Sequence, residues 1–202
     1  MPRNYGHYQA AINLFKIANS AYELGINYLT VFAFSTENWK RQTEEVNYLM
    51  EEPLKKLNKH EEKLVDIKFE IIFVGRKDRI PESMKEVIKR VEAPTKTNEG
   101  MTLQVSLDYG SKDELVHAFE NAEKPYTEEN VRKHLYVKQD VDLLIRTSGE
   151  QRLSNYLLWQ VAYAEFIFVK KHWPAFREKD LKKAIKKYSK RNRRFGALWN
   201  NF

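Results

Sequence analysis

The apolar positions of the chain alternate between helical spacing and short continuous runs. Between positions 11 and 24 they recur at intervals of three and four residues, which predicts a helix, and Gly25 suits the stop that ends it. The next segment, Tyr28–Phe34, is β-branched, aromatic and apolar almost throughout. That composition predicts a strand buried on both faces.

The same alternation continues to the other end of the chain. Thr43 begins a long charged pattern that contains Pro53, and Pro81 suits the first turn of another helix that breaks near Pro94. Thr127 suits the cap of a short helix. The remaining expected elements are helices over 43–64, 111–122 and 179–191 and strands over 68–74, 101–107, 142–145 and 165–169. Strands and helices that alternate in this way predict a single α/β domain over residues 1–202, with a mostly parallel central sheet flanked by helices.

Composition removes several classes of protein from consideration. The 202 residues are 42% hydrophobic, which is typical of a globular chain, and they include no cysteine. The absence of cysteine excludes a disulfide framework, a thiolate metal site and a catalytic thiol. No apolar run approaches the roughly 20 residues of a membrane span, and the first helix is not preceded by a signal-peptide pattern. The glycine-rich, nucleophile-elbow and HExxH signatures of dinucleotide, P-loop, hydrolase and zincin sites are missing as well.

The net charge of +7 is concentrated at one end of the chain. Residues 170–202 contain 12 basic and 2 acidic side chains, whereas the rest of the chain contains 23 basic and 26 acidic ones. A polyanion patch, a contact with an anionic membrane and a solvated helix face are all open interpretations of this basic end.

Candidate chemistry follows three of the predicted strands, because ligands of an open parallel sheet bind beyond its carboxyl edge. The segments there are 35–41, 108–112 and 146–155. In the last of them Arg146, Arg152 and Ser154 form a plausible diphosphate cradle, since guanidinium groups bind phosphate oxygens two at a time, and Gly149 permits close backbone approach. The alternative is a surface loop whose arginines pair with Glu150 and Asp142.

Two further positions stand out by residue type. Glu165 heads an apolar strand, where a carboxylate is costly to bury unless it is paired or binds a metal such as Mg²⁺, and the alternative is a glutamate that faces water. Arg3, Gly6 and His7 cluster at a helix entrance, where free amides favour an anion.

Four segments carry a resemblance to a known family. Phe34-Ser-Thr-Glu-Asn-Trp-Lys-Arg41, the run from Ile145 to Gln160, Tyr163-Ala-Glu165 and Arg193-Arg-Phe-Gly196 resemble the signature segments of the cis-prenyltransferases. They are most similar to those of the bacterial undecaprenyl diphosphate synthases. The likeness keeps the family's order and spacing from Arg3 to Gly196, so chance is a poor explanation for it.

The resemblance implies the family's fold and reaction: head-to-tail condensation of isopentenyl diphosphate onto an allylic diphosphate, farnesyl diphosphate first, with Mg²⁺. The product is a long Z-polyprenyl diphosphate, a lipid carrier for cell-wall synthesis. The resemblance also implies catalytic roles for Ser35, Asn38 and His7, and it implies that Glu165 is the family's Mg²⁺-associated glutamate. The substrate-binding positions it implies are Arg3, His7, Trp39, Arg41, Arg146, Arg152, Ser154, Arg194 and Gly196.

It also implies surroundings for the site. The Arg194-Phe-Gly196 element of related enzymes reaches a partner subunit, so we expect a homodimer. We expect a cytoplasmic location, peripheral at the inner membrane face where the product enters a bilayer. Candidates for an apolar tunnel, each of which is also explained by ordinary core packing, are Ala33, Val46, Leu49, Met50, Leu54, Ile71, Phe73, Val105 and Leu107.

The sequence departs from the family pattern at its start. The family opens with a strand and an Asp-Gly-Asn-Gly-Arg-Trp loop that binds Mg²⁺ and the allylic diphosphate, and Met1 falls after that point. Three explanations are open: a record that begins at an internal methionine or is trimmed, a non-catalytic or partner-dependent subunit, and a divergent enzyme. We predict that the chain as written has little synthase activity but binds isopentenyl diphosphate.

Two smaller departures concern phosphate contacts and chain length. The family often has Asn-Tyr-Gly-Gly-Arg where this chain has Asp108-Tyr-Gly-Ser-Lys112, and lysine lacks the bidentate fork of arginine. Pro53 lies in the helix expected to wall the tunnel, so the tunnel residues do not predict the length of the product.

A nucleic-acid-binding protein is the rival suggested by the basic end. Its lysines between 182 and 190 fall at helical spacing opposite Leu181, Ile185 and Tyr188, which is the pattern of an ordinary amphipathic surface helix. We therefore expect no nucleic-acid partner, and contact with anionic phospholipid is the favoured hypothesis for these charges.

Overall fold

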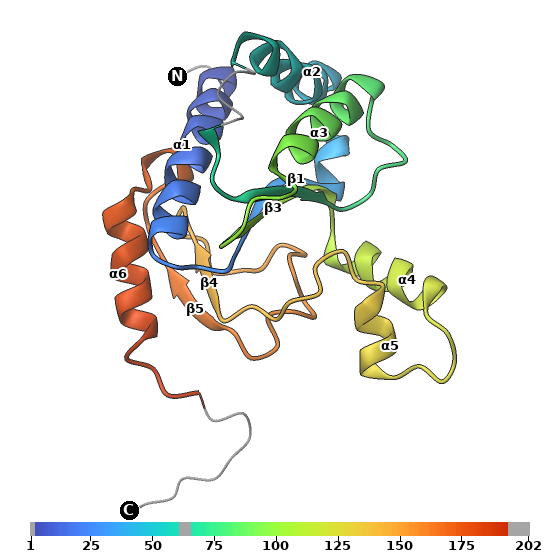
Figure 1. Cartoon of the computed structure of the whole chain (residues 1–202), viewed down its shortest axis with the longest axis vertical. Coiled ribbons are helices and arrows are strands. Elements are labelled where there is room, and N and C mark those ends of the chain that lie inside the picture. The colour runs from blue at the N-terminus through green and yellow to red at the C-terminus, as the bar shows by residue number, and fades with distance from the viewer. Residues whose placement is uncertain (1–2, 61–65, 194–202) are drawn as a thin grey trace, which may run out of the picture.

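A computed structural model describes residues 3–60 and 66–193 of the chain (Figure 1). The helices and strands alternate as the hydrophobic pattern predicts. In chain order they are α1 (Arg3–Glu23), β1 (Tyr28–Ser35), the 3₁₀ segment η1 (Thr36–Lys40), α2 (Thr43–His60), β2 (Glu70–Val74), α3 (Glu82–Thr95), β3 (Thr102–Tyr109), α4 (Ser111–Asn121), α5 (Glu128–Lys133), β4 (Leu143–Arg146), β5 (Glu165–Phe168), the 3₁₀ segment η3 (Trp173–Ala175) and α6 (Glu178–Tyr188).

The described strands are all parallel and form two ladders. β3 lies between β1 and β2, so that Val105 is in register with Val31 on one side and with Phe73 on the other. β4 and β5 form a separate pair in which Leu143 is opposite Glu165 and Arg146 is opposite Phe168. The expectation of a parallel α/β sheet is confirmed, and its division into two parts is added by the structure.

The core lies around β3, which is buried at every position after Thr102. Ile17 and Ala18 of α1 and Val87 and Ile88 of α3 belong to the same buried cluster as the alternate residues of β3. α3 packs on β2 and against α2, while α1 contacts α6 and η3. The helices therefore cover the three-stranded ladder and leave its carboxyl edge as the place where loops meet.

The expectation that the first strand is buried on both faces is wrong. Phe34 is the one fully buried residue of β1, and Tyr28 at its start is 48% exposed. The physical reason is position in the sheet: within the described residues β1 has a ladder partner, β3, along one edge. An apolar composition indicates a strand but does not say whether that strand is central or at an edge.

The proline positions refine two helices. α2 continues through Pro53, and α3 continues past Pro94 to Thr95, with Pro81 as its N-cap instead of its first residue. Pro94 lies in the last turn of α3, so the helix ends one residue after it. No helix within the described residues is long and apolar enough to cross a membrane.

Candidate functional site

A cleft of about 610 Å³ opens between β1, η1 and the loop that follows β4. It brings together five of the residues that the sequence selects: Ser35, Asn38, Arg41, Arg146 and Ser154. The other lining residues are Phe32, Ala33, Phe34, Glu37, Leu49 and Asn155. Because these segments follow two separate strands, the cleft lies where a parallel sheet normally binds its ligand.

Arg146 is the cationic centre of the cleft. It is the last residue of β4, and its Nε is buried without a hydrogen-bond partner among the described residues. A buried N–H donor that lacks an acceptor costs about 1–3 kcal/mol relative to one that is paired. The cost is avoided when an anionic ligand in the cleft supplies the acceptor, which makes this atom the clearest mark of a binding site in the described chain.

The turn after β1 is organised by its own polar side chains. Asn38 Oδ1 accepts a hydrogen bond from the main-chain N–H of Ser35 at 3.0 Å, which caps η1 and holds both residues at the cleft wall. Arg41 is paired with Glu45 at 2.8 Å. The cleft therefore offers hydroxyl and amide groups close to arginine.

The loop after β4 has an unusual backbone. Ser148, Ser154 and Asn155 have positive φ angles of 69°, 54° and 59°, a region that residues other than glycine rarely occupy. Main-chain bonds hold the start of this loop, because the N–H groups of Ser148 and Gly149 donate to carbonyls beyond β5 at 2.7 and 3.0 Å. Strained backbone that is held in this way is common at binding sites.

Asn155 connects three segments around the cleft. Its Oδ1 accepts from the N–H of Lys112 at 2.9 Å, its carbonyl accepts from the N–H of Ser111 at 2.8 Å, and its Nδ2 donates to Glu37 Oε1 at 2.8 Å. Partial burial favours a higher pKa for Glu37, but the hydrogen bond from Asn155 and those of its neighbours outweigh it and lower the pKa. Sequence reasoning missed both residues. The signal for Asn155 is its tolerance of positive φ within a serine- and arginine-rich loop.

Two predicted substrate residues lie away from the cleft wall. Arg152 is 65% exposed and pairs with Glu150, which is the partner named in the surface-loop alternative. Asp142, the other acidic residue of that alternative, pairs with Arg193 at 2.6 Å. Trp39 is turned toward the core, where its indole N–H donates to Asp108 at 2.7 Å.

Glu165, the expected magnesium ligand, lies at the amino end of β5. Its register partner is Leu143, whereas Arg146 at the cleft is at the other end of the same ladder. Its Oε2 accepts from Arg191 at 2.7 Å. No group of three acidic, histidine or cysteine side chains that could hold a metal occurs in the described part of the chain.

Four other predicted residues are not located by the structure. Arg3 and His7 belong to α1, but their side chains lie outside what the structure describes. Arg194 and Gly196 lie beyond residue 193, outside the described residues. Their expected roles therefore stay predictions.

The candidates for a tunnel wall lie in different surroundings. Ala33 and Leu49 line the cleft. The side chain of Leu54 is outside the description, and Phe73 is half-buried against the core. The others are ordinary buried core residues: Val46, Met50, Ile71, Val105 and Leu107.

A buried polar network joins the end of β3 to α4 and to the segment that follows the cleft loop. The Glu114 carboxylate of α4 accepts from the Tyr109 hydroxyl, from the N–H of Val137 at 3.0 Å and from the Gln160 amide at 3.1 Å. Burial, together with the neighbouring Glu114 carboxylate, raises the pKa of the Tyr109 phenol. The hydroxyl therefore stays a donor, and the network fixes the end of β3 relative to the segment that follows the cleft loop.

Comparison with known proteins gives consistent relatives. Residues 1–196 match the family profile described as undecaprenyl diphosphate synthase. An isoprenyl transferase of Thermotoga maritima is 44% identical over 99% of this chain and 90% of its own length. A farnesyl-diphosphate-specific ditrans,polycis-undecaprenyl-diphosphate synthase of Micrococcus luteus is 40% identical over 98% of this chain and 84% of its own.

Solved structures agree with the sequence relatives. A lavandulyl diphosphate synthase of Lavandula x intermedia, crystallised with dimethylallyl diphosphate, superimposes with a TM-score of 0.88 at 33% identity. The match covers 96% of this chain and 89% of that one.

Proposed function

We propose, because the chain belongs to the undecaprenyl diphosphate synthase family, that it takes part in prenyl transfer from an allylic diphosphate to isopentenyl diphosphate. The product would be a Z-polyprenyl diphosphate. Farnesyl diphosphate is the proposed primer, since it is the specificity carried in the name of the Micrococcus luteus relative.

The observation that supports this proposal most directly is the buried Nε of Arg146, which lacks a hydrogen-bond partner among the described residues and belongs to a cleft that also contains Ser154. A diphosphate supplies the acceptors that this donor lacks, and guanidinium binds phosphate oxygens in pairs. We assign the isopentenyl diphosphate to this half of the cleft. Arg152 can contact the diphosphate only after its ion pair with Glu150 breaks, so we propose a smaller role for Arg152 than for Arg146.

The allylic substrate is assigned to the other half, near Ser35, Asn38 and Arg41. In the reaction, the terminal alkene carbon of isopentenyl diphosphate bonds to C1 of the allylic substrate, the C1–O bond breaks, and a proton leaves C2 of the isopentenyl unit. Negative charge grows on the departing diphosphate, and a fixed arginine stabilises it most where water is excluded. Ala33 and Leu49 on the cleft wall would contact the growing hydrocarbon.

In this proposal, Mg²⁺ binds together with the diphosphate substrates. It would neutralise diphosphate oxygens when bound. Glu165 is its expected ligand by resemblance, but the described contacts of Glu165 are those of an ion pair with Arg191, and no step above depends on the metal. A homodimer and a peripheral contact with the cytoplasmic membrane face complete the proposal, and nucleic acid has no part in it.

Binding tests the site. We expect the purified chain to bind isopentenyl diphosphate in calorimetry, and Arg146→Met to weaken Kd about 100-fold, since a charge-assisted bidentate contact is worth about 1.5–3 kcal/mol. Arg146→Lys should weaken Kd about 10-fold, because it keeps the charge and loses the fork. Arg132→Met removes a surface arginine of α5 that pairs with Asp140, and it should leave binding unchanged. Absence of binding by the unaltered chain would overturn the proposal.

Turnover tests the reaction. The chain is incubated with labelled isopentenyl diphosphate and farnesyl diphosphate, and the extracted polyprenyl product is measured. Product formation would support a complete enzyme. Intact binding without turnover would instead support the partner-dependent subunit.

A further inference from the structure

Asp108 is a buried carboxylate that the proposed mechanism does not use. It is the penultimate residue of β3, its side chain is 0% exposed, and its φ angle of 49° lies in the left-handed region. Burying a charge is costly unless it is paired and hydrogen-bonded, and holding aspartate at positive φ adds backbone strain. Both costs need a compensating interaction at this position.

The compensation comes from two other segments of the chain. Arg79, in the loop between β2 and α3, binds the carboxylate with both arms of its guanidinium: Nε donates to Oδ2 at 2.9 Å and Nη2 donates to Oδ1 at 2.5 Å. Trp39 of η1 donates its indole N–H to Oδ1 at 2.7 Å. All three donors are directed at one buried anion, which makes this a fully paired site.

The indole of Trp39 is held on other sides as well. The Arg79 guanidinium carbon lies 5.7 Å from its ring centre, and Phe34 meets it edge to face at 5.2 Å. Trp39 directly follows Asn38, which lines the cleft and caps η1 through Ser35. The position of the indole therefore determines where this wall of the cleft lies.

Residues 108–112, at the end of β3 and the start of α4, also support the opposite wall of the cleft, which is the loop after β4. The main-chain N–H groups of Ser111 and Lys112 hold Asn155, as described above. Gly110 lies between these contacts, and a Cβ built there would come within 2.5 Å of Thr36 Oγ1 and 2.8 Å of Asn155 Nδ2. Residues 108–112 are thus a common support for η1 and for the loop after β4.

We propose that Asp108 is a positioning residue: its buried carboxylate, clamped by Arg79, fixes the indole of Trp39 and thereby sets the η1 wall of the substrate cleft. Asparagine would accept the indole N–H but would not hold Arg79 as a bidentate ion pair. The substitution Asp108→Asn therefore removes the charge of this side chain while it keeps the side chain's shape.

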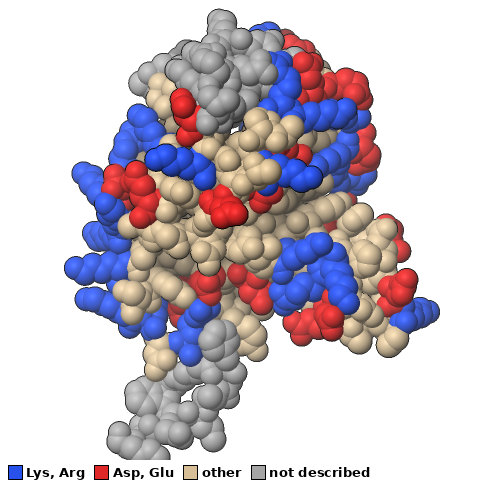
Figure 2. Space-filling view, in the orientation of Figure 1, with Lys and Arg blue, Asp and Glu red and all other residues tan. Residues whose placement is uncertain are grey.

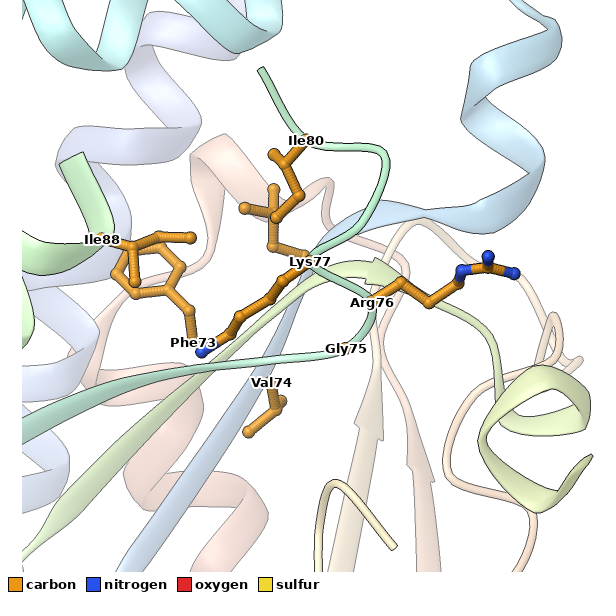
Figure 3. A pocket seen from close by; sticks show the side chains of 8 residues that line it. Phe73, Val74, Gly75, Arg76, Lys77, Ile80 and Ile88 are labelled. Carbon is orange, nitrogen blue, oxygen red and sulfur yellow. The ribbon is translucent and has the colours of Figure 1, made fainter. Parts of the chain in front are cut away.

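Arg76 provides a matched control in the same loop. Its side chain donates to Asp78 at 2.6 Å and to Asp113 of α4 at 2.9 Å. Figure 3 shows it directed away from Ile80 and Ile88, which point into the apolar side of the loop. Losing the Arg76 side chain removes both of these ion pairs and leaves the described contacts of Trp39 in place.

The test is fluorine NMR of the whole chain labelled with 5-fluorotryptophan. Four tryptophans are present, and the resonance that disappears in Trp39→Phe belongs to Trp39. We expect Asp108→Asn and Arg79→Gln each to shift and broaden that resonance while those of Trp159 and Trp173 stay in place. Arg76→Gln should leave all four unchanged. The proposal is overturned if the Trp39 resonance in both variants matches that of Arg76→Gln.

Measurements of folding and stability separate a positioning role of Asp108 from a role in folding. Arg79 is 38% exposed in this pair, so Arg79→Gln keeps the test available if Asp108→Asn does not fold, and circular dichroism verifies folding of each variant. Adding Asp108→Asn to Arg79→Gln removes the unpaired buried charge, and we expect the double variant to be no less stable than Arg79→Gln alone.

The kinetic arm rests on the proposed function: kcat/KM for the allylic diphosphate should fall about 10-fold in Asp108→Asn, because misplaced binding groups slow reaction without being lost. If the unaltered chain shows no turnover, the NMR measurement still decides the role of Asp108.

Discussion

Single side chains with partners in distant segments hold the cleft together. Asn155 and Asp108 each join segments that are more than 40 residues apart in sequence. Arg146 presents a buried N–H donor that has no acceptor in the part of the chain that the structure describes. Arg152 and Lys112 lie in the same two segments as these residues, but both are exposed. The hydrogen-bond partners of a side chain therefore indicate its role in the cleft better than its residue type does.

Asn155 allows the connection between the cleft walls to be measured. Asn155→Gly removes both side-chain hydrogen bonds but keeps positive φ, and we expect it to cost about 1 kcal/mol of unfolding free energy. Asn155→Ala should cost about 1–2 kcal/mol more, because alanine adds strain in the left-handed region. Urea denaturation measures both values.

The matched control is Asn121→Ala, which removes bonds made by one exposed asparagine to His117 within the same helix. Equal stability of Asn155→Gly and the unaltered chain would contradict a connecting role for the Asn155 side chain.

Elements meet at the carboxyl edge of the sheet through loop-to-helix contacts. The β2–α3 loop is joined to α4 by the Arg76–Asp113 pair and returns to the end of β3, where the N–H of Arg76 donates to the Asp108 carbonyl at 3.2 Å. Gly75 has a φ of 126°, and a Cβ there would lie 2.2 Å from the carbonyl oxygen of Leu107. A glycine is required where these two strands end so close together.

The Arg76 contacts make this edge sensitive to acid. Hydrogen bonds from Arg76 hold the pKa of Asp78 at about 2, below its ordinary value of 3.8. A carboxylate with a lowered pKa in the folded state stabilises the fold above its ordinary pKa, and this contribution is lost as the pH falls from about 4 to 2. Because Asp78 is exposed, the effect is screened and should stay below about 1 kcal/mol.

We therefore expect Asp78→Asn to lower the unfolding free energy at pH 6, and we expect its difference from the unaltered chain to shrink as the pH falls toward and through 2, as measured by urea denaturation at low salt. Glu99→Gln, which removes an exposed carboxylate without an ion pair to any described residue, should show no such convergence. A difference between Asp78→Asn and the unaltered chain that persists unchanged to pH 2 would exclude this pair as its source.

The whole molecule carries its charge unevenly. Lys and Arg side chains project along the edge where α6 lies (Figure 2). α6 buries Leu181 and Ala184 and pairs Lys182 with Glu178, while Lys183, Lys186 and Lys187 are exposed. This is a helix that packs one face on the body and presents cations on the other, so a surface of anionic lipid headgroups fits it.

Liposome sedimentation tests this surface. We expect the chain to bind vesicles that contain anionic phospholipid and not neutral vesicles, and Lys183→Gln with Lys187→Gln to reduce binding about 10-fold or more, at about 1 kcal/mol per lysine near the surface. Lys89→Gln with Lys96→Gln makes the same charge change at exposed positions of α3 and its C-cap, and it should have little effect. Equal recovery with both vesicle types would rule the contact out.

The sequence by itself determined the succession of elements, the parallel α/β class and the segments that meet at the carboxyl edge of the sheet. Periodicity reports local burial, and strand ends of a parallel sheet share one edge, so Ser35, Asn38, Arg146 and Ser154 could be predicted to meet. The structure places all four along one cleft, and their roles there stay predictions.

Only the tertiary structure decided which of these side chains are available. The Nε of Arg146 has no hydrogen-bond partner within residues 3–60 and 66–193, whereas Arg152 pairs with Glu150. Trp39 turns to Asp108, and Glu165 lies at the opposite end of its ladder from Arg146. The physical reason is that ion pairs and hydrogen bonds act over a few ångströms, and residues 69 positions apart, such as Trp39 and Asp108, come within that range only when the fold places the elements that carry them side by side.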